Sequence, residues 1–324
     1  MQINTIFFGS PEIAAQLLED ITNIPILNIS LVVTQPDKPM GKKLEITPTL
    51  VKKLAIKKNI PVFDKNIRDK AVLQELITLL KKLSPTLGIL YAYGALIPQE
   101  VIDIFPQGIW NVHPSLLPLY RGPSPTAYPL LLGDKKTGVT IMKLVKKLDA
   151  GPIIVQKEVI VKNETTRKKL EFELTKIAAD LLINKISDLA KKIDIKTQEQ
   201  DTSKSTYTRL LKKEDGYLAP EIIREAIDGN TISPKNYPSI IMDYMTQYDR
   251  HHVKFASEIV YNLFRGLSPW PGIWTVVQTS KGLKRLKILE MQLEGKNLNI
   301  QTVQLEGKGP VEFKTFIKAY SLQH

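Results

Sequence analysis

Two polar side chains near the middle of the chain have the spacing of a catalytic pair. Residues 107–122 read QGIWNVHPSLLPLYRG, and Asn111 and His113 stand two apart at the end of an apolar run. On a β-strand this spacing places both side chains on the same face. An amide and an imidazole on one face can stabilise an oxyanion or move a proton. The alternative is a histidine that only fastens a loop, and this short pattern leaves both possibilities open.

A carboxylate further along the chain is the third candidate. Asp149 lies in KLVKKLDAGPIIVQ, between two expected strands, and is followed by Ala150 and Gly151. Next to His113, this carboxylate would favour the charged imidazolium over the neutral ring. Aspartate before a glycine is also common in ordinary turns, so Asp149 by itself does not decide the question.

The elements that must position these residues alternate between strand and helix. Pro114 cannot donate to a sheet, so we expect the strand at 108–113 to end at His113. We expect Ser10 and Thr47 to cap helices ahead of Pro11 and Pro48. The patterns predict strands at 3–9, 26–34, 61–63, 85–93, 108–113, 137–145 and 151–161, and helices at 10–20, 47–59, 69–83, 97–105 and 165–192.

This alternation predicts an α/β domain with a mostly parallel sheet covered on both faces. Ligands of such sheets bind beyond the carboxyl ends of the strands, where Asn111 and His113 would lie. The polar stretch 192–208 has little to bury and reads as a linker. After it, short alternating strands with glycine-bearing turns predict a small barrel or sandwich.

Composition limits the classes of function. The chain has 45 Lys and Arg against 33 Asp and Glu, a net charge of +12, which favours an anionic partner such as nucleic acid. A generally lysine-rich surface would give the same excess.

With no cysteine there is no disulfide, thiolate metal site or cysteine nucleophile. The first strand-to-helix turn has one glycine, Gly9, too few for a dinucleotide fingerprint. No apolar run reaches the ~20 residues of a membrane span, so we expect a cytoplasmic protein without membrane contact.

A longer stretch, residues 111–156, carries a resemblance to a known family. Its motifs stand in order: Asn-x-His-x-Ser-Leu-Leu-Pro (111–118), Arg-Gly (121–122), Thr-Gly-Val-Thr (137–140) and Asp-x-Gly (149–151). This set resembles the formyltransferase family that uses 10-formyltetrahydrofolate. The segments FFGSPEIAAQLL, TQPDKPMGKKL, YAYGALIP, TYTRLLKKEDG and RGLSPWPGIW are similar to the family members that act on methionyl initiator tRNA.

The resemblance implies a domain organisation. Residues 1–191 would form a Rossmann-like, doubly wound catalytic domain, 192–208 a linker, and 209–324 a C-terminal OB-like β-barrel that contacts tRNA. The chain departs from the family pattern by an insert at about residues 216–252 and by a barrel that lacks a pair of strands. His251 and His252 stand inside the insert, but no carboxylate cluster frames them, and no metal site is expected.

The resemblance also implies a reaction. The α-amine of methionyl initiator tRNA would attack the formyl carbon, and Asn111 and protonated His113 would stabilise the resulting oxyanion. Asp149 would keep His113 charged and assist proton removal. The formyl group arrives activated on the folate, so no metal is needed. The folate site would be lined by Ser115, Leu116, Leu117 and Pro118 and bordered by the turn Ala92, Tyr93 and Gly94.

A lysine-bearing stretch between a strand and a helix is the candidate tRNA contact. TQPDKPMGKKLEITPTL is long for such a connection. By the resemblance it would reach the acceptor end of the tRNA, with Lys38, Lys42 and Lys43 on phosphates. The alternative is a flexible solvated loop.

Two other functions stay open at this point. One is a sugar-nucleotide N-formyltransferase, which shares the motif at 111–118 and the aspartate. The other is a non-catalytic RNA-binding protein on this scaffold, against which the intact Asn111, His113 and Asp149 argue. The leading expectation is a cytoplasmic monomer whose partners are methionyl initiator tRNA and 10-formyltetrahydrofolate.

Overall fold

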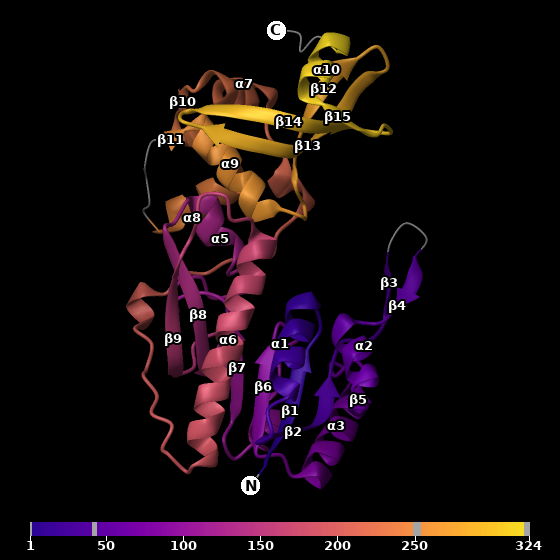
Figure 1. Cartoon of the computed structure of the whole chain (residues 1–324), viewed down its shortest axis with the longest axis vertical. Helices are drawn as coiled ribbons and strands as arrows, with labels where there is room; N and C mark the ends of the chain where they lie inside the picture. The colour runs from indigo at the N-terminus through magenta and orange to yellow at the C-terminus, as the bar shows by residue number, and fades with distance from the viewer. Residues whose placement is uncertain (1, 41–43, 249–253, 321–324) are drawn as a thin grey trace. The chain divides into compact units, whose positions relative to one another are not determined.

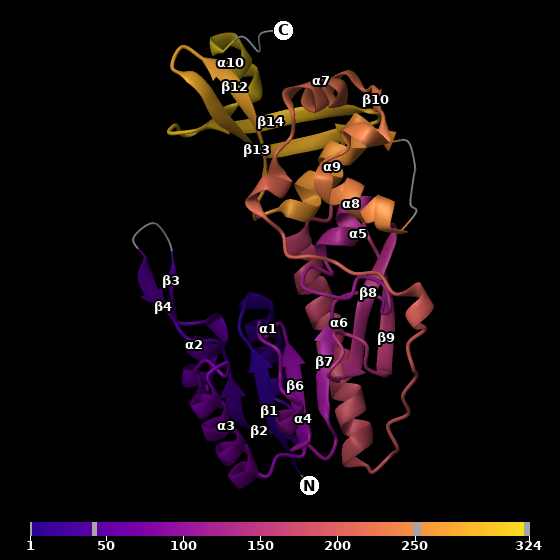
Figure 2. The same ribbon diagram turned by 180° about the vertical axis from the view of Figure 1, so that it is seen from behind.

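The computed structural model describes residues 2–40, 44–248 and 254–320, and within them two compact units (Figures 1 and 2). The first unit comprises residues 1–122, 138–159 and 171–207. The second comprises residues 123–137, 160–170 and 208–324. The predicted catalytic residues and the predicted linker stretch up to residue 207 all lie in the first unit.

The first unit is built on a seven-stranded sheet with the strand order β5-β2-β1-β6-β7-β8-β9. Strands β5, β2, β1, β6 and β7 run parallel, and β8 pairs antiparallel with β7. The mostly parallel sheet predicted from the sequence is therefore confirmed. The strands are β1 Ile3–Gly9, β2 Leu27–Val33, β5 Val62–Phe63, β6 Leu87–Tyr91, β7 Ile109–His113, β8 Lys136–Lys143 and β9 Ile153–Ile160.

Helices cover both faces of this sheet, as a doubly wound fold requires. Ile6 and Phe8 of β1 pack with Leu76 and Leu80 of α3 in one core cluster. Because neighbouring side chains on a strand point to opposite faces, Phe7 belongs to the other face. The helices are α1 Glu12–Thr22, α2 Leu50–Lys57, α3 Lys70–Leu83, α4 Gln99–Ile102 and α6 Arg167–Ala190, which begins in the second unit's segment.

Two of the predicted helix caps are wrong. Helix α1 begins at Glu12 with Pro11 at the cap position, because the Ser10 hydroxyl is used elsewhere: it donates to the Tyr93 carbonyl at 3.0 Å. Helix α2 begins at Leu50, and the Thr49 side chain, not that of Thr47, accepts from the backbone at the cap. Thr47 is the last residue of a strand instead.

That strand belongs to a β-hairpin that the sequence analysis did not predict. Strands β3 (Lys38–Met40) and β4 (Glu45–Thr47) pair antiparallel between β2 and α2 (Figure 1). Lys52 of α2 forms ion pairs with Asp37, at the base of the hairpin, at 2.8 Å and with Asp64, directly after β5, at 2.6 Å. These two carboxylates raise the pKa of Lys52 above its usual value.

The second unit combines a four-stranded antiparallel sheet with helices. The sheet is consistent with the predicted small barrel, but the sequence analysis did not predict the helices of this unit. The strands are β12 Ile273–Thr279, β13 Gly282–Glu294, β14 Asn297–Leu305 and β15 Pro310–Glu312, with the two-residue pair β10 Thr231–Ile232 and β11 Lys254–Phe255. The helices are α5 Ala127–Leu132, α7 Pro220–Asp228, α8 Ser239–Tyr248, α9 Ala256–Leu267 and α10 Phe313–Ala319.

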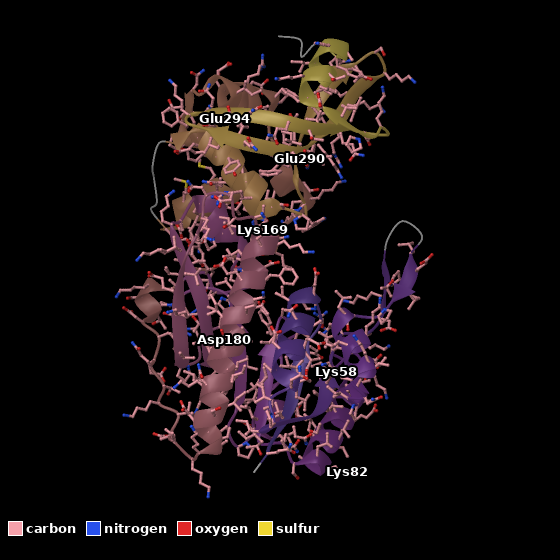
Figure 3. The ribbon with its side chains drawn as sticks, viewed as in Figure 1. Lys58, Lys82, Lys169, Asp180, Glu290 and Glu294 are labelled. Atoms are coloured by element: carbon pink, nitrogen blue, oxygen red, sulfur yellow. The ribbon has the colours of Figure 1, made fainter. Side chains whose placement is uncertain are left out.

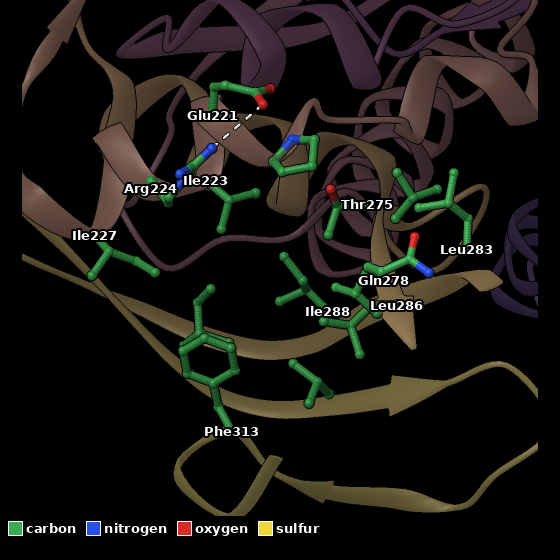
Figure 4. A pocket seen from close by; sticks show the side chains of 15 residues that line it. Glu221, Ile223, Arg224, Ile227, Thr275, Gln278, Leu283, Leu286, Ile288 and Phe313 are labelled. Atoms are coloured by element: carbon green, nitrogen blue, oxygen red, sulfur yellow. Dashed lines mark hydrogen bonds and ion pairs between the residues drawn. The ribbon is translucent and has the colours of Figure 1, made fainter. Parts of the chain in front are cut away.

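A cavity of about 280 Å³ lies inside the second unit, lined by α7, by three strands of the sheet and by Phe313 (Figure 4). Its walls are mostly apolar, with an exposed ion pair between Glu221 and Arg224 at 3.4 Å. None of the predicted site residues lines this cavity. All of its lining residues belong to the second unit, whereas the predicted catalytic residues belong to the first.

Charged side chains are spread over both units, as the labelled Lys58, Lys82, Glu290 and Glu294 illustrate (Figure 3). Residues 1–203 carry 28 basic and 21 acidic residues, and residues 204–324 carry 17 and 12, so neither part alone holds the positive excess. Among the helices of the described ranges, none is both long and apolar enough to cross a bilayer.

Candidate active site

Asn111 and His113 lie together where the sequence predicted them. Strand β7 ends at His113, directly before Pro114, and both side chains are almost completely buried. Leu90 of β6 pairs with Asn111 in parallel register, and Tyr91 of β6 pairs with Gly9 of β1. The carboxyl ends of three neighbouring strands therefore meet at the edge of the sheet that carries the two side chains.

Asp149 joins this pair from the loop between β8 and β9. Its Oδ2 atom is 3.7 Å from His113 Nδ1, and its Oδ1 accepts from Asn111 Nδ2 at 3.4 Å. Its shortest bond comes from the backbone N–H of Gly122, at 2.7 Å. The side chain is 11 % exposed, so few water molecules can compete for these contacts.

The opposite edge of the His113 ring is held by the main chain. The distance from His113 Nε2 to the carbonyl oxygen of Tyr120 is 2.9 Å. A carbonyl can only accept, so Nε2 must carry a proton. A proton on Nδ1 as well would make the ring a cation facing the Asp149 carboxylate. The geometry accommodates the charged imidazolium that the sequence analysis proposed.

Three residues of the site have left-handed backbone conformations. Tyr120 has φ 61°, Asp149 has φ 47°, and Gly122 has φ 107°. Such angles are natural for glycine but cost the other two residue types about 1 kcal/mol or more each. The surrounding hydrogen bonds must therefore hold these two loops in place.

The segment Ser115–Pro118 forms a tight turn whose polar groups are hydrogen-bonded to other residues of the protein. Ser115 is fully buried and donates its hydroxyl to Leu119 O at 2.7 Å. Thr140 of β8 supports the turn: its hydroxyl donates to Ser115 O at 2.7 Å and accepts from Leu117 N at 3.2 Å. This contact gives the Thr-Gly-Val-Thr motif a physical role. Leu116 and Pro118 are the partly exposed members of the turn.

The turn Ala92–Gly94 follows β6, one strand away from β7. Ala92 and Gly94 are exposed, with φ 49° and 87°. Tyr93 instead points into the core, where its ring meets Phe8 edge-on at 5.9 Å between ring centroids. Burial raises the pKa of Tyr93 to about 12, so its hydroxyl stays neutral at ordinary pH. A ligand at this turn would meet mainly backbone and the small side chain of Ala92.

Of the three lysines predicted to contact tRNA, the structure describes one. Lys38 is exposed at the start of β3 in the hairpin. Lys42 and Lys43, like His251 and His252, lie outside the described residues. In the parts of the chain that the structure does describe, no group of three or more His, Asp or Glu side chains is arranged to hold a metal ion.

Sequence reasoning missed three groups that shape the site. The Gly122 N–H and the Tyr120 carbonyl are backbone groups without a side-chain signal, although the Arg-Gly motif marked their neighbourhood. The third is Gln200, whose amide donates to Asp149 O at 3.0 Å and to Gly151 O at 2.7 Å. It stands in the polar stretch read as a linker, and nothing in the local sequence distinguishes it.

Comparison with known proteins places the chain in a family. Residues 1–186 match the family model described as formyl transferase. The match covers more than half of the chain and contains Asn111, His113 and Asp149. The chain belongs to the formyl transferase family.

Relatives of this formyl transferase carry a more specific name. It is 34 % identical over 302 residues to the methionyl-tRNA formyltransferase of Caldicellulosiruptor saccharolyticus, covering 93 % of this chain and 83 % of that protein. It is 35 % identical over 305 residues to the protein of the same name from Chloroflexus aurantiacus, covering 94 % and 86 %. These matches extend through both units, so the family assignment is not limited to the catalytic motifs.

Solved structures support the fold of this formyl transferase. A 4-N formyltransferase from Francisella tularensis superposes with a TM-score of 0.59 at 14 % identity, covering 90 % of this chain and 98 % of that one. A sugar 3N-formyl transferase determined in the presence of dTDP and 5-N-formyl-THF gives 0.55 at 15 % identity, covering 95 % and 100 %. At these identities the likeness concerns the fold alone.

Proposed function

We propose that this protein transfers the formyl group of 10-formyltetrahydrofolate to the α-amine of methionyl initiator tRNA. The observation that carries the proposal is the contact of Asn111 and His113 with Asp149 at the carboxyl edge of the sheet. These three residue types can stabilise an oxyanion and accept a proton, which are the two requirements of acyl transfer to an amine. The relatives named methionyl-tRNA formyltransferase support the choice of acceptor.

In the proposed mechanism, Asn111 and His113 act on the formyl oxygen. The amine nitrogen forms a bond to the formyl carbon, and the bond from that carbon to the folate nitrogen breaks. Negative charge develops on the formyl oxygen during attack, where the Asn111 amide and the His113 imidazolium would donate hydrogen bonds. Asp149 keeps the imidazolium charged and accepts the proton that the amine loses, and the departing folate nitrogen takes up that proton as its bond to the carbon breaks.

The distances fit a site that tightens around its substrates. The 3.4 Å and 3.7 Å contacts of Asp149 are longer than good hydrogen bonds, whereas the Gly122 bond is 2.7 Å. Asn111 can therefore turn toward a substrate oxygen without breaking a strong bond to Asp149, and His113 can donate from Nδ1 while Nε2 stays bonded to the Tyr120 carbonyl. Long catalytic contacts of this kind are common before the reactive complex forms.

The folate would occupy the edge beside β6 and β7. On one side the turn Ala92–Gly94 offers exposed backbone groups, which suit the hydrogen-bonding edge of a pterin ring. On the other side Leu116 and Pro118 offer partly exposed apolar surface beside His113. The hairpin that bears Lys38 is the proposed contact for the tRNA backbone.

An acceptor assay tests this function. The protein is incubated with 10-formyltetrahydrofolate and either methionyl initiator tRNA, uncharged initiator tRNA or an amino-sugar nucleotide, and formyl transfer is followed. The expected result is formylation of methionyl initiator tRNA only, because uncharged tRNA lacks the amine. Transfer to the sugar nucleotide instead would make the protein a sugar N-formyltransferase. RNA binding with no transfer to any acceptor would make it a non-catalytic RNA-binding protein.

A further inference from the structure

Residues 198–207, which we name the strap, run along the first unit after α6 (Figure 2). One end is fixed to β9, because Gln198 and Ile153 exchange backbone hydrogen bonds of 2.7 and 2.8 Å. The other end is fixed to the loop after β7, where the Thr206 carbonyl accepts from Arg121 N at 2.8 Å. The strap therefore connects the two loops that build the proposed active site.

Thr206 is hydrogen-bonded to the loop that supports His113. Its hydroxyl accepts from Tyr120 N at 2.9 Å, and its backbone N–H donates to Pro118 O at 3.3 Å. The carbonyl of the same Tyr120 is the partner of His113 Nε2. The backbone N–H of Tyr120 is thus bonded to the strap, and its carbonyl is bonded to the proposed catalytic histidine.

Gln200 ties the strap to both loops through one side chain. Its Nε2 donates to the backbone carbonyls of Asp149 and Gly151, at 3.0 and 2.7 Å. Its Oε1 accepts from Arg121, at 2.7 Å from Nη2 and 3.2 Å from Nε. The side chain is only 9 % exposed, and Arg121 is fully buried. These bonds are therefore shielded from competition by water.

These contacts lie on both sides of the shortest hydrogen bond that the Asp149 carboxylate accepts. The residue after Arg121 is Gly122, whose N–H donates to the Asp149 carboxylate at 2.7 Å. Gln200 thus contacts the chain on both sides of this bond: the Arg121 side chain on one loop, and the backbone carbonyls of Asp149 and Gly151 on the other. Displacement of either loop would move the carboxylate relative to His113. Positioning errors of about 1 Å can lower catalytic rates about 100-fold.

We propose that Gln200 is a positioning residue that sets the geometry between Asp149 and His113. This inference rests on the proposed function, because it assigns Gln200 a part in the same reaction. The position requires a carboxamide, since one group must accept from a guanidinium and also donate to two carbonyls. A glutamate could still accept from Arg121 but could not donate to Asp149 O or Gly151 O.

The test compares Gln200→Leu and Gln200→Glu with the matched control Gln198→Leu. Gln198 has the same side chain on the same strap, but it is exposed, and its described bonds use the backbone. We expect both Gln200 variants to lower kcat about 10- to 100-fold while KM for each substrate stays within about threefold. The control should match the wild type. Gln200→Glu keeps a partner for Arg121, so it remains informative if Gln200→Leu does not fold.

Two results would overturn the proposal: a near-normal kcat in Gln200→Glu, or loss of kcat and substrate affinity in equal measure. A second readout does not depend on activity. The imidazole NMR signals of His113, assigned with His113→Ala, should shift in Gln200→Glu and coincide with the wild type in Gln198→Leu. Unchanged signals in Gln200→Glu would contradict the positioning role even if the wild type formylated no acceptor. An inactive wild type with shifted signals would refute the proposed function alone.

Discussion

At the scale of single residues, the three contacts of Asp149 differ in length. Its bond from the Gly122 N–H is short, at 2.7 Å, while its contacts with Asn111 and His113 are 3.4 and 3.7 Å. The backbone bond fixes where the carboxylate sits. The two longer contacts leave the Asn111 amide able to reorient and the Nδ1 edge of His113 available to a substrate oxygen, while the Tyr120 carbonyl holds the Nε2 edge. A fixed anion beside two available donors is suited to a reaction in which negative charge appears on the substrate.

The substitution Asp149→Asn removes the negative charge of the side chain and keeps its size, so it tests what the charge contributes to the reaction. The amide has nearly the same size, so folding should be retained, but it cannot stabilise the imidazolium or accept a proton. We expect kcat for formyl transfer to fall about 10²- to 10⁴-fold. The measurement is steady-state kinetics with methionyl initiator tRNA, with thermal unfolding as the control for folding. Wild-type turnover in a folded variant would remove Asp149 from the mechanism.

At the scale of elements, the carboxyl edge of the sheet was largely predictable and the loops around it were not. The end of β7 at His113 followed from Pro114, because a residue without N–H cannot extend the ladder. The family motifs indicated Asp149 and its place beside His113, but not its bond from the Gly122 N–H. The Ser10 cap prediction failed because the Ser10 hydroxyl bonds to a distant loop, and the Thr47 prediction failed because Thr47 ends strand β4. The role of Gln200 could not be predicted, since its partners are backbone carbonyls about 50 residues away.

The contact between β8 and the turn Ser115–Pro118 makes an element-level prediction. Thr140→Val preserves the shape of the side chain but leaves Ser115 O and Leu117 N without the Thr140 hydroxyl, their hydrogen-bond partner. Burying two unsatisfied backbone groups should lower the free energy of unfolding by about 2–4 kcal/mol. Urea unfolding measures this, and Thr197→Val, at an exposed position, is the control. Equal stability of the two variants would show that Thr140 does not support the turn.

At the scale of the whole molecule, the charge distribution bears on tRNA binding. The net charge of +12 is shared by both parts of the chain, so long-range attraction to a polyanion does not depend on one patch. In the proposed function, the seven-stranded sheet carries the catalytic residues, and the hairpin with Lys38 offers a local contact for a tRNA phosphate. The second unit adds an antiparallel sheet, which is consistent with the predicted small barrel, and helices that the sequence patterns did not predict.

Binding of initiator tRNA should therefore depend strongly on salt. We expect the Kd to rise about 10- to 100-fold between about 50 and about 200 mM salt, because each neutralised phosphate releases counterions. Lys38→Ala should weaken binding and reduce the slope of log Kd against log salt by about 1. Lys82→Ala, at an exposed site at the end of α3, should leave that slope unchanged. Fluorescence anisotropy measures all three, and equal slopes for the two variants would exclude Lys38 as a phosphate contact.

The most direct test of the central claim is the single-turnover rate of formyl transfer from 10-formyltetrahydrofolate to methionyl initiator tRNA, measured for the wild type and for His113→Ala. We expect formylated tRNA with the wild type and a rate at least about 100-fold lower with the variant, at unchanged tRNA affinity. A folded His113→Ala protein whose rate stays within about threefold of the wild type would contradict the claim.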